Sequence, residues 1–373
     1  MKRQSKVHKV RKTLLSGAIL LFSIASCKND KAIEEKHDKI KKAKNVILLI
    51  GDGMGLSQIS SSFYFNDQPS NFPRFKHIGL IRTSSSSHKI TDSAAGATAF
   101  STGKKSYNGA IGVDPDTSKV ETIMEILNEE YVTGLVATSS ITHATPASFY
   151  AHVKLRGMQE EIARQLVYSP VDFFAGGGQK FFAHRRDQVN YLDSLTAQGF
   201  KIDTTSLGAS SELSSENKYG YLLANDGMPK MLEGRGNFLV DASKLALDYL
   251  TMDDRQFYLM IEGSQIDWGG HSNDADYLIS EMIDFDKAVG LALDFAEKDQ
   301  NTLVIVTADH ETGGFTLSSK DGNYDEIDGT FSTGGHSTTL IPVFAYGPGS
   351  ENFIGIYENN EIFHRVNSAM GIE

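Results

Sequence analysis

Acidic residues and histidines stand at or just after the ends of several short apolar runs of this sequence, where they could bind metal ions. They are Asp52, Glu262, Asp267, Asp309 and His310. Carboxylate oxygens and imidazole nitrogens are the side-chain ligands that divalent metal ions use in proteins. A metal centre assembled from several segments of the chain is therefore predicted.

Two sets of three residues match a catalytic zinc site, which has three protein ligands and an open position. In one set, Asp267 and His271 stand four residues apart and the distant His336 is the third member. The other set is Asp52, Asp309 and His310. An isolated Asp–His pair is common on protein surfaces, but residues that each follow a strand favour two zinc ions.

A third set offers only oxygen ligands. Glu262 contributes a carboxylate and Thr145 a hydroxyl. Oxygen ligands suit magnesium better than zinc. We therefore expect one magnesium ion beside the two zinc ions.

Ser93 is the candidate nucleophile. It precedes a run of small residues that favours the start of a helix, which would place its hydroxyl near an electropositive N-terminus. The alternative is an ordinary N-cap serine, worth about 1 kcal/mol. A zinc ion could replace a general base here, because coordination lowers the pKa of a bound oxygen.

These residue types together suit phosphoryl transfer. That reaction needs a nucleophile, neutralisation of the non-bridging oxygens and stabilisation of the leaving group. Ser93 and two zinc ions would supply the first and the last. Neutralisation of the non-bridging oxygens favours an arginine, because its planar guanidinium matches two phosphate oxygens better than the ammonium of lysine does.

The elements that must position these residues alternate between strands and helices. Apolar runs predict buried strands at 45–51, 132–138, 257–262, 302–307 and 340–346. Helical patterns cover 122–130 and roughly 274–298. The alternation predicts an α/β fold with a largely parallel central sheet and helices on both faces. In such sheets ligands bind beyond the carboxyl ends of the strands. Residues 183–235 are more polar and are interpreted as an excursion or lid.

Six segments resemble the successive signatures of the alkaline phosphatase family, in that family's order. They are Gly51–Gly55, Thr91–Thr98, Thr145-Pro146, Glu262–Asp267, Thr307–His310 and Gly335-His336. The resemblance implies an alkaline-phosphatase-like fold and the hydrolysis of phosphate monoesters to alcohol and inorganic phosphate at alkaline pH. It also implies a broad substrate range, a phosphoserine intermediate, two Zn²⁺ and one Mg²⁺ per active site, and a homodimer.

The resemblance also implies a role for each matching residue. One zinc would bind Asp267, His271 and His336, and the other Asp52, Asp309 and His310, in contact with the nucleophile Ser93. Magnesium would bind Asp52, Thr145 and Glu262.

Arg156 matches the position of the family's phosphate-binding arginine, and Arg164 is the alternative. His143 and Trp268 stand where the familiar enterobacterial enzyme has Asp and Lys, although they occur together in other members of the family. Both are expected near the substrate and the magnesium site. Because nitrogen is a poor magnesium ligand, we expect His143 to weaken magnesium retention.

Composition excludes several other classes of protein. The 373 residues carry a net charge of -11, which argues against a nucleic-acid partner because such proteins need a basic surface. The single cysteine, Cys27, rules out an intrachain disulfide.

The first residues are interpreted as an export signal. A basic segment and a short apolar run fill residues 1–26, and the ending Ile24–Cys27 resembles a bacterial lipobox. We expect an exported protein that lipid on Cys27 anchors in the cell envelope, on the periplasmic or outer-membrane side. Residues 27–44 would form a polar tether and 45–373 the phosphatase domain. The alternative is a signal peptide cut near Ser26 with an incidental cysteine.

Two other functions remain open at the level of sequence. One is a phosphodiesterase or sulfatase of the same superfamily, although these usually show a different context around the nucleophile. The other is a lipid-anchored protein that binds phosphate without turnover. The presence of both Ser93 and a candidate arginine favours the phosphatase.

Overall fold

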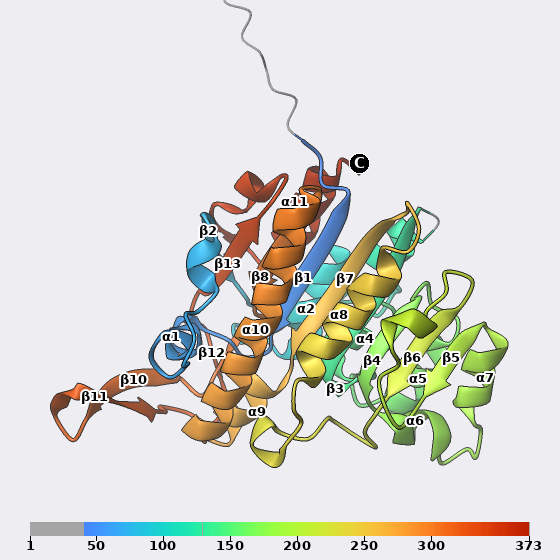
Figure 1. Cartoon of the computed structure of the whole chain (residues 1–373). Coiled ribbons are helices and arrows are strands. Elements are labelled where there is room, and N and C mark those ends of the chain that lie inside the picture. The colour runs from blue at the N-terminus through green and yellow to red at the C-terminus, as the bar shows by residue number, and fades with distance from the viewer. Residues whose placement is uncertain (1–40, 129, 373) are drawn as a thin grey trace, which may run out of the picture. The chain divides into compact units, whose positions relative to one another are not determined.

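The computed structural model describes residues 41–128 and 130–372 (Figure 1). The predicted signal, the lipobox with Cys27 and most of the predicted tether lie outside these residues. Among the residues that the structure describes, no helix has both the length and the apolar composition that a membrane crossing requires.

A ten-stranded sheet forms the centre of the domain, in the order β14-β2-β13-β8-β1-β7-β3-β4-β6-β5. Its strands are β1 Asn45–Gly51, β2 His77–Arg82, β3 Tyr131–Ser140, β4 Phe173–Gly177, β5 Phe200–Asp203, β6 Lys218–Leu222, β7 Gln256–Gly263, β8 Thr302–Thr307, β13 Ile341–Tyr346 and β14 Gly355–Glu358. Only β13 runs antiparallel to its neighbours, β2 and β8. The predicted α/β fold with a largely parallel sheet is confirmed, and β5 and β6 of the 183–235 stretch extend the sheet at one edge.

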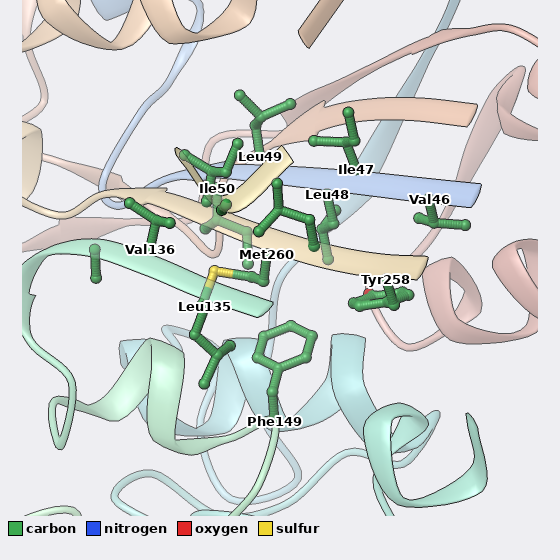
Figure 2. Close-up of a cluster of buried hydrophobic side chains, with 14 of the residues drawn as sticks. Val46, Ile47, Leu48, Leu49, Ile50, Leu135, Val136, Phe149, Tyr258 and Met260 are labelled. Atoms are coloured by element: carbon green, nitrogen blue, oxygen red, sulfur yellow. The ribbon is translucent and has the colours of Figure 1, made fainter. Parts of the chain in front are cut away.

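The central strands are apolar along their whole length because both of their faces are covered. Residues Val46 to Ile50 of β1 have no exposed surface. Figure 2 shows these side chains with Met260 of the neighbouring strand β7, Leu135 of the next strand β3, and Phe149 beneath them. Burial on both faces explains why these strands read as continuous apolar runs rather than as alternating patterns.

Helices pack on both faces of the sheet. The long helix α10, Ala275–Asp299, and α8, Phe238–Leu250, cover one face, and α2, Ser93–Thr102, and α4, Ala144–Ala147, lie on the other (Figure 1). The helix predicted over 274–298 is therefore α10. The helix predicted over 122–130 is shorter, α3 Ile123–Leu127, because the chain turns into β3 at Tyr131.

Shorter elements complete the domain. The remaining helices are α1 Leu56–Tyr64, α5 Gln159–Leu166, α6 Gln179–Ala183, α7 Tyr191–Ala197, α9 Gln265–His271 and α11 Glu361–Met370. Short 3-10 turns occur at Phe72–Arg74, Ser210–Glu212, Met231–Glu233 and Ser350–Phe353. Two small antiparallel sheets pair β10 Thr316–Lys320 with β11 Asn323–Thr330, and β9 Glu311–Thr312 with β12 His336–Ser337.

The strand register brings the predicted site residues to one end of the sheet. Ile50 of β1 lies opposite Glu262 of β7 on one side and Thr307 of β8 on the other. Asp52 and Asp309 come just after these strand ends and therefore lie near Glu262.

Candidate active site

Ser93 lies beside a buried group of metal-ligating side chains. Its hydroxyl Oγ is 3.3 Å from Nε2 of His310 and 3.5 Å from Oδ1 of Asp52. Asp52, Asp309 and His310 each offer a ligand atom within 4.8 Å of the others, and none of the three has exposed surface. The structure therefore brings together the candidate nucleophile and the residues predicted for one zinc.

The start of helix α2 fixes the position of Ser93. Ser93 is the first residue of the helix, and Asp92, not Ser93, is the N-cap: its Oδ1 accepts a hydrogen bond from Ala95 N at 3.0 Å. The N-cap alternative for Ser93 is thus excluded, and its hydroxyl is left free of a capping role. Gly96 lets the helix approach the ligand loop, because a Cβ there would lie 2.9 Å from Cβ of Asp309.

The residues predicted for the other zinc also lie together. Nε2 of His271 is 3.4 Å from Oδ1 of Asp267 and 3.1 Å from Nε2 of His336. The His336 ring stacks on His310 at 3.5 Å between centroids, so the two sets of ligands adjoin.

Backbone carbonyls orient two of these imidazoles for metal binding. Nδ1 of His271 lies 2.8 Å from Gly334 O, and Nδ1 of His336 lies 2.8 Å from Thr91 O. Because a carbonyl can only accept, each Nδ1 donates to it, which leaves Nε2 as the nitrogen that each ring offers to a metal ion. Such a partner is the usual arrangement behind a histidine that binds metal.

Thr312 is a residue that the sequence analysis did not identify. Its buried hydroxyl Oγ1 is 2.5 Å from Oδ1 of Asp267 and 3.2 Å from Nδ1 of His310. It therefore contacts one member of each predicted zinc set. Its place two residues after His310 was the only signal, and a single threonine at that spacing indicates no chemistry by itself.

The predicted magnesium residues gather at the ends of β1 and β7. Ligand atoms of Asp52, His143 and Glu262 lie within 4.8 Å of one another. Burial raises the pKa of Glu262 to about 7 and also raises the pKa of Asp52 and Asp309; repulsion from the Asp309 carboxylate is a further cause for Asp52 and Glu262. Thr145, at the start of α4, is fully buried.

Divalent metal ions fit this arrangement. Within residues 41–128 and 130–372, four of the buried side-chain atoms that have no hydrogen-bond partner are oxygens of this site: Asp52 Oδ2, Thr145 Oγ1, Glu262 Oε1 and Asp309 Oδ2. Unpaired buried polar atoms are costly, and bound cations both satisfy such atoms and stabilise ionised carboxylates. The donor set contains the oxygen and imidazole ligands that divalent ions require.

Arg156, rather than Arg164, lies at the site. Its Nη1 donates to Oδ2 of Asp92 at 3.2 Å, and its Nη2 is 3.1 Å from Nε2 of His143. Arg164 instead pairs with Glu161 on the exposed side of α5. Asp92, the N-cap residue next to the candidate nucleophile, therefore also orients the guanidinium.

His143 and Trp268 meet beside this arginine. Their rings are in edge-to-face contact with centroids 6.0 Å apart. Burial, and after it the charge of Arg156, lowers the pKa of His143 to about 3. The imidazole is therefore neutral at neutral and alkaline pH, and its Nε2 accepts the hydrogen bond from Arg156.

Comparisons with known proteins agree with this geometry. The family model for alkaline phosphatase matches residues 43–328. Alkaline phosphatase 3 of Bacillus subtilis is 33% identical, with 96% of this chain and 95% of that protein covered. Alkaline phosphatase of Escherichia coli is 30% identical, with 89% and 87% covered.

A solved structure is still more similar. Alkaline phosphatase from the Antarctic bacterium TAB5 superposes with a TM-score of 0.88 at 59% identity, covering 89% of this chain and 99% of that one. A histidine-to-aspartate variant of the TAB5 enzyme, similar to the same extent, has magnesium bound in its M3 site. Sequence signatures, sheet order and the grouping of Ser93 with buried ligands thus agree, and this chain belongs to the alkaline phosphatase family.

Proposed function

We propose that this chain hydrolyses a broad range of phosphate monoesters at alkaline pH through a phosphoserine intermediate at Ser93, with two Zn²⁺ and one Mg²⁺ bound. Family membership supports the reaction class and a need for divalent metal ions. The observation that carries the residue assignment is that Ser93 Oγ faces the buried Asp52–His310 group while Asp92, the preceding residue, pairs with Arg156.

The proposed residues hold the metal ions in three sets. One zinc would bind Asp267, His271 and His336; the other, Asp52, Asp309 and His310 with Ser93; and magnesium, Asp52, Thr145 and Glu262. When bound, such ions supply Lewis-acid stabilisation of negative charge on oxygen.

Arg156 would bind two non-bridging oxygens of the phosphoryl group. A guanidinium has five N–H donors, and the contacts to Asp92 and His143 use two of them. These two contacts hold the fork in place, so that binding phosphate costs little reorganisation. Trp268, against His143, completes this side of the site.

The reaction would proceed in two displacements at phosphorus. Ser93 Oγ gives its proton to water and attacks phosphorus, the bond from phosphorus to the ester oxygen breaks, and the leaving ester oxygen takes a proton from water to become the alcohol. Water then attacks phosphorus and loses one proton, the bond to Oγ breaks, Oγ takes up a proton in turn, and inorganic phosphate leaves.

Activity measurements on the purified protein with its metals test this proposal. We expect zinc and magnesium to copurify, and hydrolysis of 4-nitrophenyl phosphate to be much faster than that of a phosphate diester or a sulfate ester. Faster diester or sulfate hydrolysis would assign the site to another activity of the superfamily. Phosphate binding without turnover of any ester would identify a binding protein.

We also propose that the protein is exported, carries lipid on Cys27 and forms a homodimer. Support comes from the sequence before Cys27 and from the family resemblance. Mass spectrometry of membrane-extracted protein should find a lipidated N-terminal Cys27, and Cys27→Ser should release the protein into the soluble fraction. An unmodified chain starting elsewhere would contradict the anchor, and a single-chain mass in light scattering would contradict the dimer.

A further inference from the structure

A buried ionic cluster outside the catalytic groups attaches the loop of residues 224–235, called the 224–235 loop, to helix α10. Arg235 donates to both carboxylate oxygens of Glu281 and, at 2.9 Å, to Oδ2 of Asp284. The three side chains are 2% exposed or less. Glu281 also accepts from Met231 N at 2.9 Å, and Arg235 donates to Pro229 O at 3.1 Å. The cluster therefore fixes both ends of the segment 229–235.

The same loop continues to the active site. Residues before this segment are held by Gln265. Its Nε2 donates to Met228 O at 2.7 Å and to Thr138 O at 2.9 Å. Gly227 lies against the indole of Trp268, since a Cβ at this position would be 2.5 Å from Cη2 of the ring. A glycine is needed here because the backbone itself covers the indole.

Contacts run without interruption from this loop to the phosphate-binding arginine. Trp268 meets His143 edge to face, and Nε2 of His143 is 3.1 Å from Nη2 of Arg156. A displacement of the 224–235 loop would thus free the indole, then the imidazole, and then one side of the guanidinium. A buried ion pair is weak evidence for stability, because desolvation offsets much of its attraction. A geometric role is the better explanation of why charge is buried here.

We propose that Arg235 is a positioning residue of the active site: by its bidentate pair with Glu281 and its bond to Asp284, it holds the 224–235 loop against Trp268 and thereby fixes His143 and Arg156. The inference rests on the proposed function only for its effect on catalysis. The position of Trp268 can be measured without any turnover.

The sequence offers a direct probe, because Trp268 is the only tryptophan. Its emission spectrum and its quenching by acrylamide report on the surroundings of this one indole, in the intact protein with its metals. Arg235→Met would leave two buried carboxylates unpaired and could prevent folding, so the main variant is the neutral triple Arg235→Met, Glu281→Gln, Asp284→Asn. Arg255→Met is the matched control, because Arg255 pairs only loosely with Asp253 at the surface, at 3.8 Å.

We expect the triple variant to shift the emission to longer wavelength, to increase acrylamide quenching at least twofold and to raise the inhibition constant for inorganic phosphate severalfold, at unchanged zinc content. Arg235→Lys keeps the charge but loses the bidentate guanidinium. Its emission wavelength, acrylamide quenching and phosphate inhibition constant should lie between those of wild type and of the triple variant. Gly227→Ala should reproduce the spectral change with the ionic cluster intact.

Two results would overturn the proposal. One is a triple variant with wild-type emission and quenching. The other is a Gly227→Ala variant with altered emission but unchanged phosphate inhibition, which would show that the indole does not influence the arginine. A wild-type protein that hydrolyses no phosphate monoester, together with the expected spectral change in the triple variant, would count against the proposed function and not against the position of the loop.

Discussion

The guanidinium of Arg156 lies 3.2 Å from the carboxylate of Asp92, the residue immediately before Ser93. The same carboxylate caps helix α2 and accepts from Gly109 N through both oxygens, while Arg156 N donates to Gly109 O at 2.7 Å. The nucleophile and the proposed phosphate-binding group are therefore fixed to one hydrogen-bonded unit.

Arg156→Lys should weaken inhibition by inorganic phosphate and slow turnover, each by about 10-fold or more. Lysine offers a point charge without a fork and cannot reach Asp92, His143 and two phosphate oxygens together. Steady-state kinetics with phosphate as inhibitor measure the effect. Arg164→Lys is the control and should behave as wild type, because Arg164 pairs with Glu161 on the exposed side of α5. The reverse pattern would transfer the role to Arg164.

Thr312→Val should loosen zinc binding about 10- to 100-fold, since partners that orient metal ligands typically contribute that much. Valine has a similar shape but cannot donate to Asp267 or hydrogen-bond to His310. Competition with a chromogenic chelator measures the affinity. Thr312→Ser restores the hydroxyl and should recover most of it. Equal zinc affinity in the valine and serine variants would argue against a positioning role.

His143→Asp should tighten magnesium binding. The wild-type imidazole is neutral because burial and Arg156 lower its pKa to about 3, so it adds no charge to attract the ion. Magnesium titrations after chelation, with zinc held constant, give the midpoint. His143→Asn is the matched neutral control and should not share the gain. Identical midpoints in wild type and the aspartate variant would mean that His143 only packs against Trp268.

Acid should remove the stabilisation that Glu125 provides. Burial opposes its ionisation, but hydrogen bonds from His152, Lys119 and Thr122 outweigh burial and lower the pKa of Glu125 from 4.5 to about 2. Because the folded pKa is depressed, the stabilisation is present above about pH 4.5 and is lost as pH falls through about 2.

The side chain of Lys119, which pairs with Glu125, is 61% exposed, and solvent weakens such a pair. We therefore expect the contribution of the pair to be about 1 kcal/mol or less. Urea unfolding of wild type and Glu125→Gln, both metal-free, should give a stability difference that shrinks between pH 4.5 and pH 2. A constant difference over this range would exclude the assignment.

A strand or site residue could be predicted from the sequence where a local sequence pattern marks it. A residue whose role depends on partners far away along the chain could not. The five predicted strands were visible because strands that are buried on both faces are continuous apolar runs. The site residues were visible because they follow those strands and match family signatures. Thr312 and Arg235 carry no local pattern, since their partners, Asp267 and Glu281, lie about 45 residues away along the chain. The N-cap of α2 was not predictable, because Asp92 and Ser93 could each cap the helix by their residue type. Packing in the folded protein makes Asp92 the N-cap.

The central claim is that Ser93 carries phosphate during turnover. Rapid mixing with radiolabelled phosphate monoester, quenching in acid and peptide mapping would test it most directly, with Ser93→Ala as the control. We expect the label on the peptide that contains Ser93, and a variant that keeps its metals but loses label and several orders of magnitude in rate. Label on any other residue, or a Ser93→Ala variant that still turns over near the wild-type rate, would contradict the account.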